Sequence, residues 1–344
     1  MEGVNASMIT QVVAMGLFIL SVSTAQNNIG ERSAELLKSY RLYDAQFRGG
    51  RGFSDRTTSG GLAWGEARFL RDYMLCYYVS RDTYWLDKII AHFDRMMGAL
   101  ADMDGDGYLE WRDRTYSVGI AHVKPQGETH GMRLEPMHVR QFRRELARLV
   151  TGHRYQIKLV SDKVVTITDL NTGALLANKE YKERLRIAEI PGFTFTLRGK
   201  GRAGVVFVIE TIAPEACEYQ VHDGMVTYPI ALFVETVWGN PALHERYKAK
   251  ADEYAMLIHS FLHKWERTWV DLGDAGVYKF TNAQTQRFPG YSLPHNQYLA
   301  LARTWLVMQA QPHVNNRMLY RERAEKMARY FKKHLRLNNT DRKS

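Results

Sequence analysis

The segment from Asp102 to Asp113 concentrates carboxylates at a spacing that suits a hard cation. Asp102, Asp104 and Asp106 occupy its first, third and fifth positions, a glycine follows at the sixth, and Asp113 closes it at the twelfth. Calcium-binding loops have this spacing, because alternate side chains converge on one ion. On this interpretation the four aspartates are Ca²⁺ ligands, although Asp113 is one methylene shorter than the glutamate usual at the last position.

The same segment has two other interpretations. Tyr108 and Trp111 offer aromatic faces that can stack on sugar rings, while Arg112 and the acids offer polar partners. Alternatively, the segment is a plain acidic turn whose glycines adopt positive φ. A rim that faces a ligand is the first expectation, which makes Trp111 and Arg112 candidates for substrate binding, and a calcium loop is the second.

Polar and aromatic side chains also gather where three helices are expected to begin. Helix N-termini favour anionic ligands and developing negative charge. The candidates for catalysis are His222, Asp223, His295 and Tyr228, and the further candidates for substrate binding are Trp64, Glu66, Asn296 and Tyr291. A structural interpretation of one pair stays open, in which Asp223 caps its helix and His222 hydrogen-bonds a strand.

Charge and composition narrow the class of partner. The chain has 344 residues, with 47 Lys and Arg against 37 Asp and Glu, so an acidic partner is expected. The basic residues are scattered and form no nucleic-acid recognition motif, which favours an acidic polysaccharide over nucleic acid. Two cysteines, Cys76 and Cys217, either pair with each other or stay as buried thiols.

The N-terminus predicts export. A mostly apolar run from Met8 to Leu20 is followed by small residues that end at Ala25, as in a signal peptide cleaved after that residue. No later run approaches the length of a membrane-spanning helix, so no integral membrane segment is expected. The sequence thus predicts a secreted or periplasmic protein.

Hydrophobic spacing divides the remainder into helices and strands. Apolar residues recur at helical spacing on both sides of short turns, which predicts helical hairpins at residues 63–101, 227–264 and 297–335. Between the first two lie β-branched and aromatic runs separated by Gly, Asp or Asn, typical of an antiparallel sheet. The predicted divisions are a signal peptide (1–25), a first helical part (26–150), an inserted β module (151–215), a second helical part (216–337) and a polar tail (338–344).

On these residues the chain resembles the six-hairpin glycosidase-like proteins, a carbohydrate-active group with an α/α-toroid fold. The resemblance is carried by four short segments at residues 62–66, 104–111, 222–225 and 295–296. It implies a mainly α fold: a partial α/α toroid of helical hairpins with an inserted antiparallel β-sandwich or sheet. It also implies a polysaccharide substrate, but this architecture hosts lyases, hydrolases and epimerases alike.

The excess of basic residues and the His, Asn and Tyr candidates favour β-elimination, the reaction of a lyase. A lyase needs a base beside the uronate carboxylate and a group that neutralises that carboxylate. We therefore expect a secreted enzyme that cleaves an acidic, uronate-containing polysaccharide by β-elimination, with His222 or His295 as the base and Asn296 on the uronate. The alternatives are a hydrolase that uses paired carboxylates among Glu66, Glu110, Asp113 and Asp223, and a polysaccharide-binding protein without catalysis.

Overall fold

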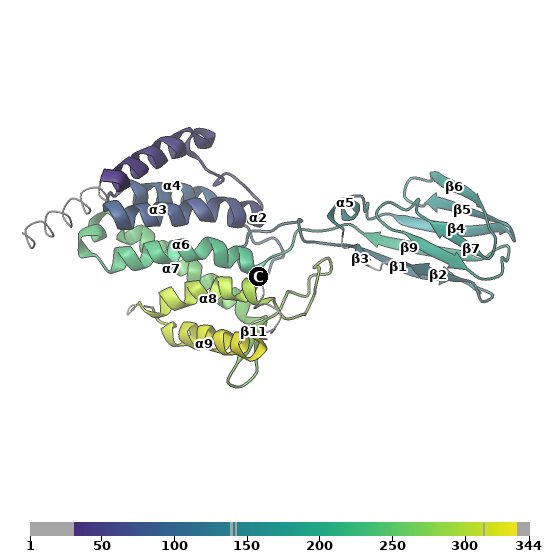
Figure 1. Cartoon of the computed structure of the whole chain (residues 1–344). Helices are drawn as coiled ribbons and strands as arrows, with labels where there is room; N and C mark the ends of the chain where they lie inside the picture. Colours follow the sequence, from purple (N-terminus) through teal and green to yellow (C-terminus); the bar gives the residue numbers. More distant parts are fainter. Residues whose placement is uncertain (1–30, 138–139, 142, 312–313, 336–344) are drawn as a thin grey trace, which may run out of the picture.

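The computed structural model describes residues 31–137, 140–141, 143–311 and 314–335, which form two parts (Figure 1). A helical part contains both ends of the described chain, and a strand part projects from one end of the helices. The predicted signal peptide and polar tail lie outside the described residues. None of the described helices is long and apolar enough to cross a membrane. Cys76 and Cys217 are both free thiols.

The helical part is built from side-by-side helices and short helical turns. Residues 31–46 are helical. They are followed by η1 (Phe47–Gly50), α2 (Ser59–Gly61), the π-helical turn η2 (Leu62–Glu66), α3 (Ala67–Ser80), α4 (Tyr84–Met97), α6 (Gln220–Trp238), η3 (Pro241–Leu243), α7 (His244–Glu266), α8 (His295–Gln309) and α9 (Arg317–His334). A small sheet of β10 (Trp269–Asp271) and β11 (Gly276–Tyr278) joins α7 to the segment before α8.

Apolar spacing explains how these helices pack. In α4, Leu86, Ile89, Phe93 and Met96 follow one another at intervals of a helical turn and are fully buried. By contrast, α6 has buried residues on most of its surface, because it lies between α3, α7 and α8. A mostly apolar helix belongs near the centre of a core, and α6 takes that position.

The strand part consists of two antiparallel sheets. The larger has the order β3-β1-β9-β4-β5-β6 and the smaller β2-β8-β7. The strands are β1 (Gly119–Gln126), β2 (Arg133–Pro136), β3 (Arg140–Gln141), β4 (Arg154–Ser161), β5 (Val164–Asp169), β6 (Leu175–Glu180), β7 (Arg184–Ile187), β8 (Phe195–Arg198) and β9 (Val206–Ile212), with the short helix α5 (Arg144–Ala147) after β3. Alternate residues of β4 point inward, and both sheets contribute to one apolar core.

The predicted mainly α partial toroid is wrong. The chain combines its helices with a six-stranded and a three-stranded antiparallel sheet, and the helices stack side by side (Figure 1). The strand part also starts at Gly119, earlier than residue 151. Residues 119–141, assigned to the first helical part, contain the three strands β1, β2 and β3. Of these, β1 pairs with the distant β9 from Ile120↔Ile212 to Gln126↔Val206.

Candidate functional site

Three helix starts converge on a pocket of about 260 Å³. We call it the aromatic pocket; its lining is Trp64, Tyr116, Tyr219, Val221, Phe280, Gln286, Arg287, Phe288, Asn296 and Gln297. The sequence-predicted residues Trp64 and Asn296 thus line the same pocket, from η2 and α8. Aromatic faces with a few amide groups suit a flat, hydroxylated ring such as a sugar.

The π-helical turn η2 presents Trp64 to this pocket. Thr58 caps the start of α2 by accepting a hydrogen bond from the Gly61 N–H, and η2 follows directly. Its wider winding leaves Trp64 39% exposed between the buried residues Ala63 and Glu66. Such π-helical turns are rare and are frequent at functional sites.

His222 lies directly behind the wall of the aromatic pocket. Its ring centroid is 5.8 Å from that of Trp64 and 5.7 Å from that of Tyr116. Ser59 Oγ is 2.7 Å from Nδ1, whereas Nε2 has no hydrogen-bond partner among the described residues. Burial lowers the pKa of His222 to about 4, although the charge of Asp113 acts in the opposite direction. The imidazole is therefore neutral at pH 7 and can accept a proton.

Asp113 holds the segment that positions Ser59. Its Oδ2 accepts a hydrogen bond of 2.9 Å from the Gly60 N–H, and its Oδ1 accepts one of 2.6 Å from the Thr115 N–H. A Cβ at Gly60 would lie 2.4 Å from Asp113 Oδ2, so only glycine fits at this position. Asp113 therefore connects the chain at Gly60 with the chain at Thr115, near His222. It does not belong to the cluster of carboxylates at residues 102–110.

A larger cleft of about 870 Å³ lies where the helical and strand parts meet. We call it the arginine cleft, because Arg112, Arg114, Arg144 and Arg148 are among its lining residues. Arg112 pairs with Glu110 at 2.7 Å and with Asp104 at 2.5 Å. Within the described part of the chain, the side chains of Arg114, Arg144 and Arg148 form no ion pair or hydrogen bond. Three positive charges are thus left for an anionic ligand.

A small pocket of about 180 Å³ connects the two sites. It shares Tyr116 and Arg287 with the aromatic pocket, and Thr115, Ser117 and Arg144 with the arginine cleft. The three pockets therefore adjoin one another, and we call them together the groove. One end of the groove is aromatic and the other is positively charged.

Asp223, a predicted catalytic residue, belongs to the core. Its Oδ2 lies 2.8 Å from Lys264 Nζ and accepts a hydrogen bond of 2.8 Å from Trp265 Nε1. Both partners of the ion pair are 1% exposed. Burial raises the pKa of Asp223, and Lys264 opposes that shift. The carboxylate supports the packing of α6 on α7 and does not line the groove.

Glu66 and Trp111 are also buried instead of facing a ligand. Glu66 Oε1 lies 2.5 Å from His92 Nδ1, and its Oε2 accepts the Phe53 N–H. Trp111 donates from Nε1 to the Met96 carbonyl oxygen at 2.9 Å and stacks on Phe261. Both side chains hold loops against the helices.

The remaining candidates near helix starts are not brought together. His295 packs on Phe331 of α9, and its Nδ1 lies 2.6 Å from Tyr298 Oη. The Tyr228 ring lies under the guanidinium of Arg303, and Tyr291 is 70% exposed outside the groove. His222 and His295 therefore do not share a site.

The acidic loop gathers a set of carboxylates that differs from the predicted one. Oxygens of Asp102, Asp104, Asp106 and Glu110 lie within 4.8 Å of one another. Glu110 thus takes the place expected for Asp113. Arg112 pairs with Asp104 and Glu110, and Arg267 pairs with Asp106, so two arginines already neutralise part of this charge.

Sequence reasoning missed Tyr116, Ser59 and Glu218. Tyr116 lines two of the three pockets, yet no pattern around it in the sequence marks it. Glu218 pairs with Arg267 at 2.7 Å. Burial raises its pKa to about 8, helped by the charges of Asp223 and Glu110 and opposed by Lys264. This shift depends on neighbours that the fold brings together, which the sequence does not reveal.

Comparisons with known proteins give no family. No protein-family model matches the chain, and no curated protein matches it. Two solved structures are similar, both of Xanthomonas campestris FlgL. One covers 77% of this chain and 92% of FlgL at 11% identity, with a TM-score of 0.23. The other, from a second crystal form, covers 59% and 88% at 11% identity, with a TM-score of 0.19. At these TM-scores the likeness carries no argument about fold or function.

Proposed function

We propose that this chain is an exported carbohydrate-active enzyme that binds an acidic, uronate-containing polysaccharide in the groove and cleaves it by β-elimination. The observation that carries the proposal is the continuity of the aromatic pocket with the arginine cleft. Aromatic rings at one end offer stacking surfaces for a sugar ring. Arginines at the other offer charged donors for carboxylate groups further along the polymer.

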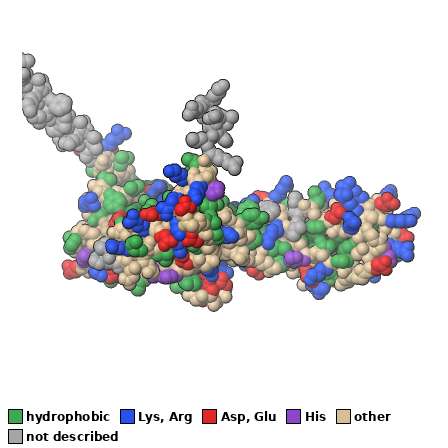
Figure 2. Space-filling view, turned by 90° about the horizontal axis from the view of Figure 1, so that it is seen from below, with side chains coloured by type: hydrophobic (Ala, Val, Ile, Leu, Met, Phe, Trp, Pro, Cys, Tyr) green, Lys and Arg blue, Asp and Glu red, His purple; other side chains and the backbone are tan. Residues whose placement is uncertain are grey.

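The distribution of charge supports an anionic polymer. Residues 119–212 contain 16 Lys and Arg against 9 Asp and Glu, so most of the chain's formal excess of +10 lies in the strand part. Figure 2 shows basic side chains along the outer rim of this part. A concentrated positive field raises the local concentration of a polyanion and speeds its association. Binding in the groove is therefore expected to weaken as salt increases.

In the proposed reaction, a base removes the proton beside the uronate carboxylate. The electron pair then forms a double bond within the ring, and the glycosidic oxygen leaves and takes up a proton. His222 is the proposed base, since it is neutral and its Nε2 has no partner among the described residues. Asn296, in the adjoining pocket wall, is proposed to donate its amide hydrogens to the carboxylate.

Polysaccharide binding without catalysis is the second candidate, and one observation favours it. His222 is 1% exposed, and Trp64, Tyr116 and Tyr219 surround its ring. A base in that position reaches a substrate only if part of the pocket wall moves. A lectin-like protein needs no such movement.

Absorbance of unsaturated uronate tests the reaction directly. The full chain is incubated with a panel of uronate polymers, and the absorbance and the reducing ends are both followed. A rise in absorbance with new reducing ends supports elimination, whereas reducing ends alone indicate hydrolysis. Saturable binding without either signal indicates the second candidate. No binding to any acidic polymer contradicts the whole proposal.

Replacing Arg144 tests the arginine cleft. We expect Arg144→Ala to weaken binding of a uronate polymer by about 10-fold to 150-fold, as for loss of a hydrogen bond to a charged group worth about 1.5–3 kcal/mol. Isothermal titration calorimetry measures the change. The matched control is Arg202→Ala, an exposed arginine of the strand part outside the groove. Equal affinities for the two variants would mean that general charge, and not the cleft, binds the polymer.

We also propose that Ca²⁺ binds the acidic loop through Asp102, Asp104, Asp106 and Glu110. An ion that binds only the native state stabilises it by about 2.7 kcal/mol at one hundred times its Kd. We expect Ca²⁺ to raise the melting temperature by a few degrees, and Asp102→Asn to remove that increase. Asp113→Asn serves as the comparison, because Asp113 lies outside the cluster. An unchanged melting temperature in millimolar Ca²⁺ would contradict this proposal. Among the described residues, Arg112 and Arg267 would then be the groups that neutralise the loop.

A further inference from the structure

Two histidines of α7 face each other across one helical turn, and neither lines the groove. His259 and His263 are four residues apart, so they share a face of the helix. Their Nε2 atoms are 3.0 Å apart, and their ring centroids are 4.4 Å apart. Asn316, the residue before α9, places its amide nitrogen 3.3 Å from His259 Nε2 and 3.5 Å from His263 Nε2. Three potential ligand groups, two from α7 and one from the residue before α9, thus converge on one point.

We propose that His259, His263 and Asn316 form a site for a divalent late transition metal. Imidazole nitrogens suit nickel, copper and zinc, and two of them on one helix turn form a chelate. With metal–nitrogen bonds of about 2.0–2.1 Å, a separation of 3.0 Å corresponds to an N–metal–N angle of about 90–100°. That angle suits the tetragonal coordination of Cu²⁺ and Ni²⁺ better than the tetrahedral coordination of Zn²⁺.

The surroundings of His259 hold its ring in the orientation that a ligand needs. Its Nδ1 lies 3.1 Å from the hydroxyl of Tyr320, which is fully buried against Trp305. When Nδ1 donates its hydrogen to this hydroxyl, the lone pair of Nε2 is free for a metal. Burial lowers the pKa of His259, and the neighbouring His263 adds to this effect.

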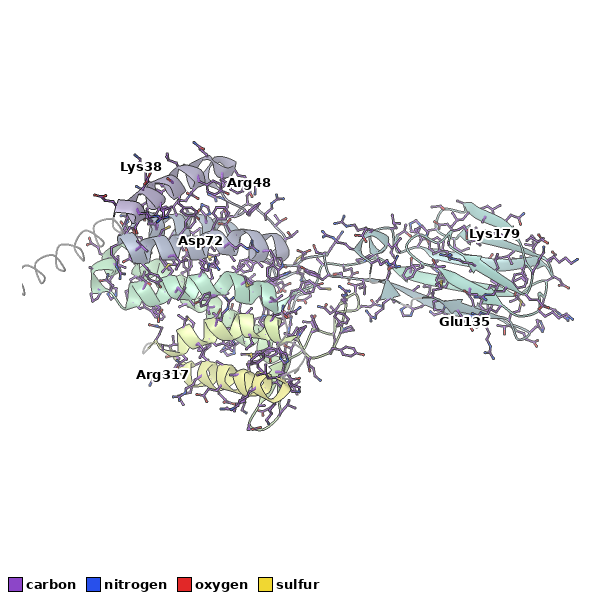
Figure 3. All side chains as sticks on the ribbon, viewed as in Figure 1. Lys38, Arg48, Asp72, Glu135, Lys179 and Arg317 are labelled. Atoms are coloured by element: carbon purple, nitrogen blue, oxygen red, sulfur yellow. The ribbon has the colours of Figure 1, made fainter. Side chains whose placement is uncertain are left out.

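The third ligand and the open positions complete the site. A half-turn of the Asn316 side-chain amide exchanges its nitrogen for its oxygen, and carbonyl oxygen is a metal ligand while amide nitrogen is not. His263 is exposed, so water or a small external ligand can occupy the remaining positions. The site lies next to Arg317, at the end of α9 farther from the strand part (Figure 3). It is therefore separate from the groove and independent of the proposed reaction.

Metal titration of the full chain tests the site. The protein, without a histidine tag, is treated with a chelator, exchanged into clean buffer and titrated with Cu²⁺, Ni²⁺ and Zn²⁺ by calorimetry. We expect one saturable site that binds Cu²⁺ more tightly than Ni²⁺, together with nitrogen couplings in the electron paramagnetic resonance spectrum of the copper form. The absence of a saturable site for all three ions would overturn the proposal.

Matched variants assign the ligands. His263 is exposed, so His263→Ala is expected to leave the fold intact and to weaken Ni²⁺ binding by at least about tenfold. Tyr320→Phe removes only the supporting hydrogen bond, and we expect a loss of roughly tenfold to a hundredfold with unchanged stoichiometry. The control is His122→Ala, which removes an exposed histidine from β1. Wild-type affinity in His263→Ala would show that the bound ion lies elsewhere.

Discussion

Lys264→Met is expected to lower the free energy of unfolding by about 3–5 kcal/mol, the usual effect of removing one partner from a buried ion pair. Lys264 Nζ lies 2.8 Å from Asp223 Oδ2, and both side chains are almost fully shielded from water. Methionine keeps much of the length and apolar volume of lysine but leaves the carboxylate without its counter-charge. Urea denaturation followed by circular dichroism measures the loss.

Two further variants separate this charge effect from a packing effect. Asp223→Asn combined with Lys264→Met removes both charges and keeps an acceptor for Trp265 Nε1, so most of the lost stability is expected to return. Lys248→Met breaks an exposed pair with Asp252 on the same helix and is expected to cost less than about 1 kcal/mol. A Lys264→Met protein as stable as the Lys248→Met protein would contradict the assigned role.

The pH dependence of Lys264→Met gives a second check. Burial raises the pKa of Asp223, and Lys264 is the group that opposes this shift. Without Lys264, the folded protein keeps a proton on Asp223 over a pH range in which the unfolded chain has released it. Stability therefore falls as the pH rises above the ordinary carboxyl range. The deficit of the variant is expected to be larger at pH 8 than at pH 5.

Local patterns predicted the elements better than their arrangement. The spacing of Leu86, Ile89, Phe93 and Met96 marks the buried face of α4, and alternation in β4 marks its inward residues. The same patterns failed at β1, where Gly119–Gln126 has no strong alternation of its own. Its strand conformation comes from pairing with β9, whose residues follow their partners by 80 to 92 positions in the chain. Pairing between residues so far apart cannot be recognised from a short stretch of sequence.

Residue type alone did not distinguish site residues from core residues. Trp64 and Trp111 both lie beside polar, glycine-containing turns in the sequence. Nevertheless, Trp64 lines the aromatic pocket, whereas Trp111 packs on Phe261. The difference arises from the π-helical turn at Leu62–Glu66 and from the hydrogen bond between Trp111 Nε1 and Met96. Likewise, Asn296 reaches the pocket while His295, its neighbour, turns toward α9, because successive residues of a helix point in different directions.

His222→Ala is expected to lower kcat/KM for a uronate polymer by about 10²–10⁴-fold, the usual contribution of a positioned base. Because the pKa of His222 is about 4, the imidazole stays neutral down to mildly acidic pH, and the acid limb of kcat/KM is expected near that value instead of near 6.5. Stopped assays of unsaturated uronate across the pH range measure both effects.

Two control variants test whether the loss of activity in His222→Ala comes from loss of the base. His295→Gln changes a histidine that packs on α9, and its rate is expected to stay close to that of the natural chain. Ser59→Ala removes only the partner of Nδ1, so a smaller loss and a shifted acid limb are expected, since that partner orients the ring. If His222→Ala binds the polymer normally and retains full turnover, the base is another group, and Tyr116 at the pocket wall is the next candidate. If the natural chain binds without turnover, the closed position of His222 explains why, and the groove serves recognition alone.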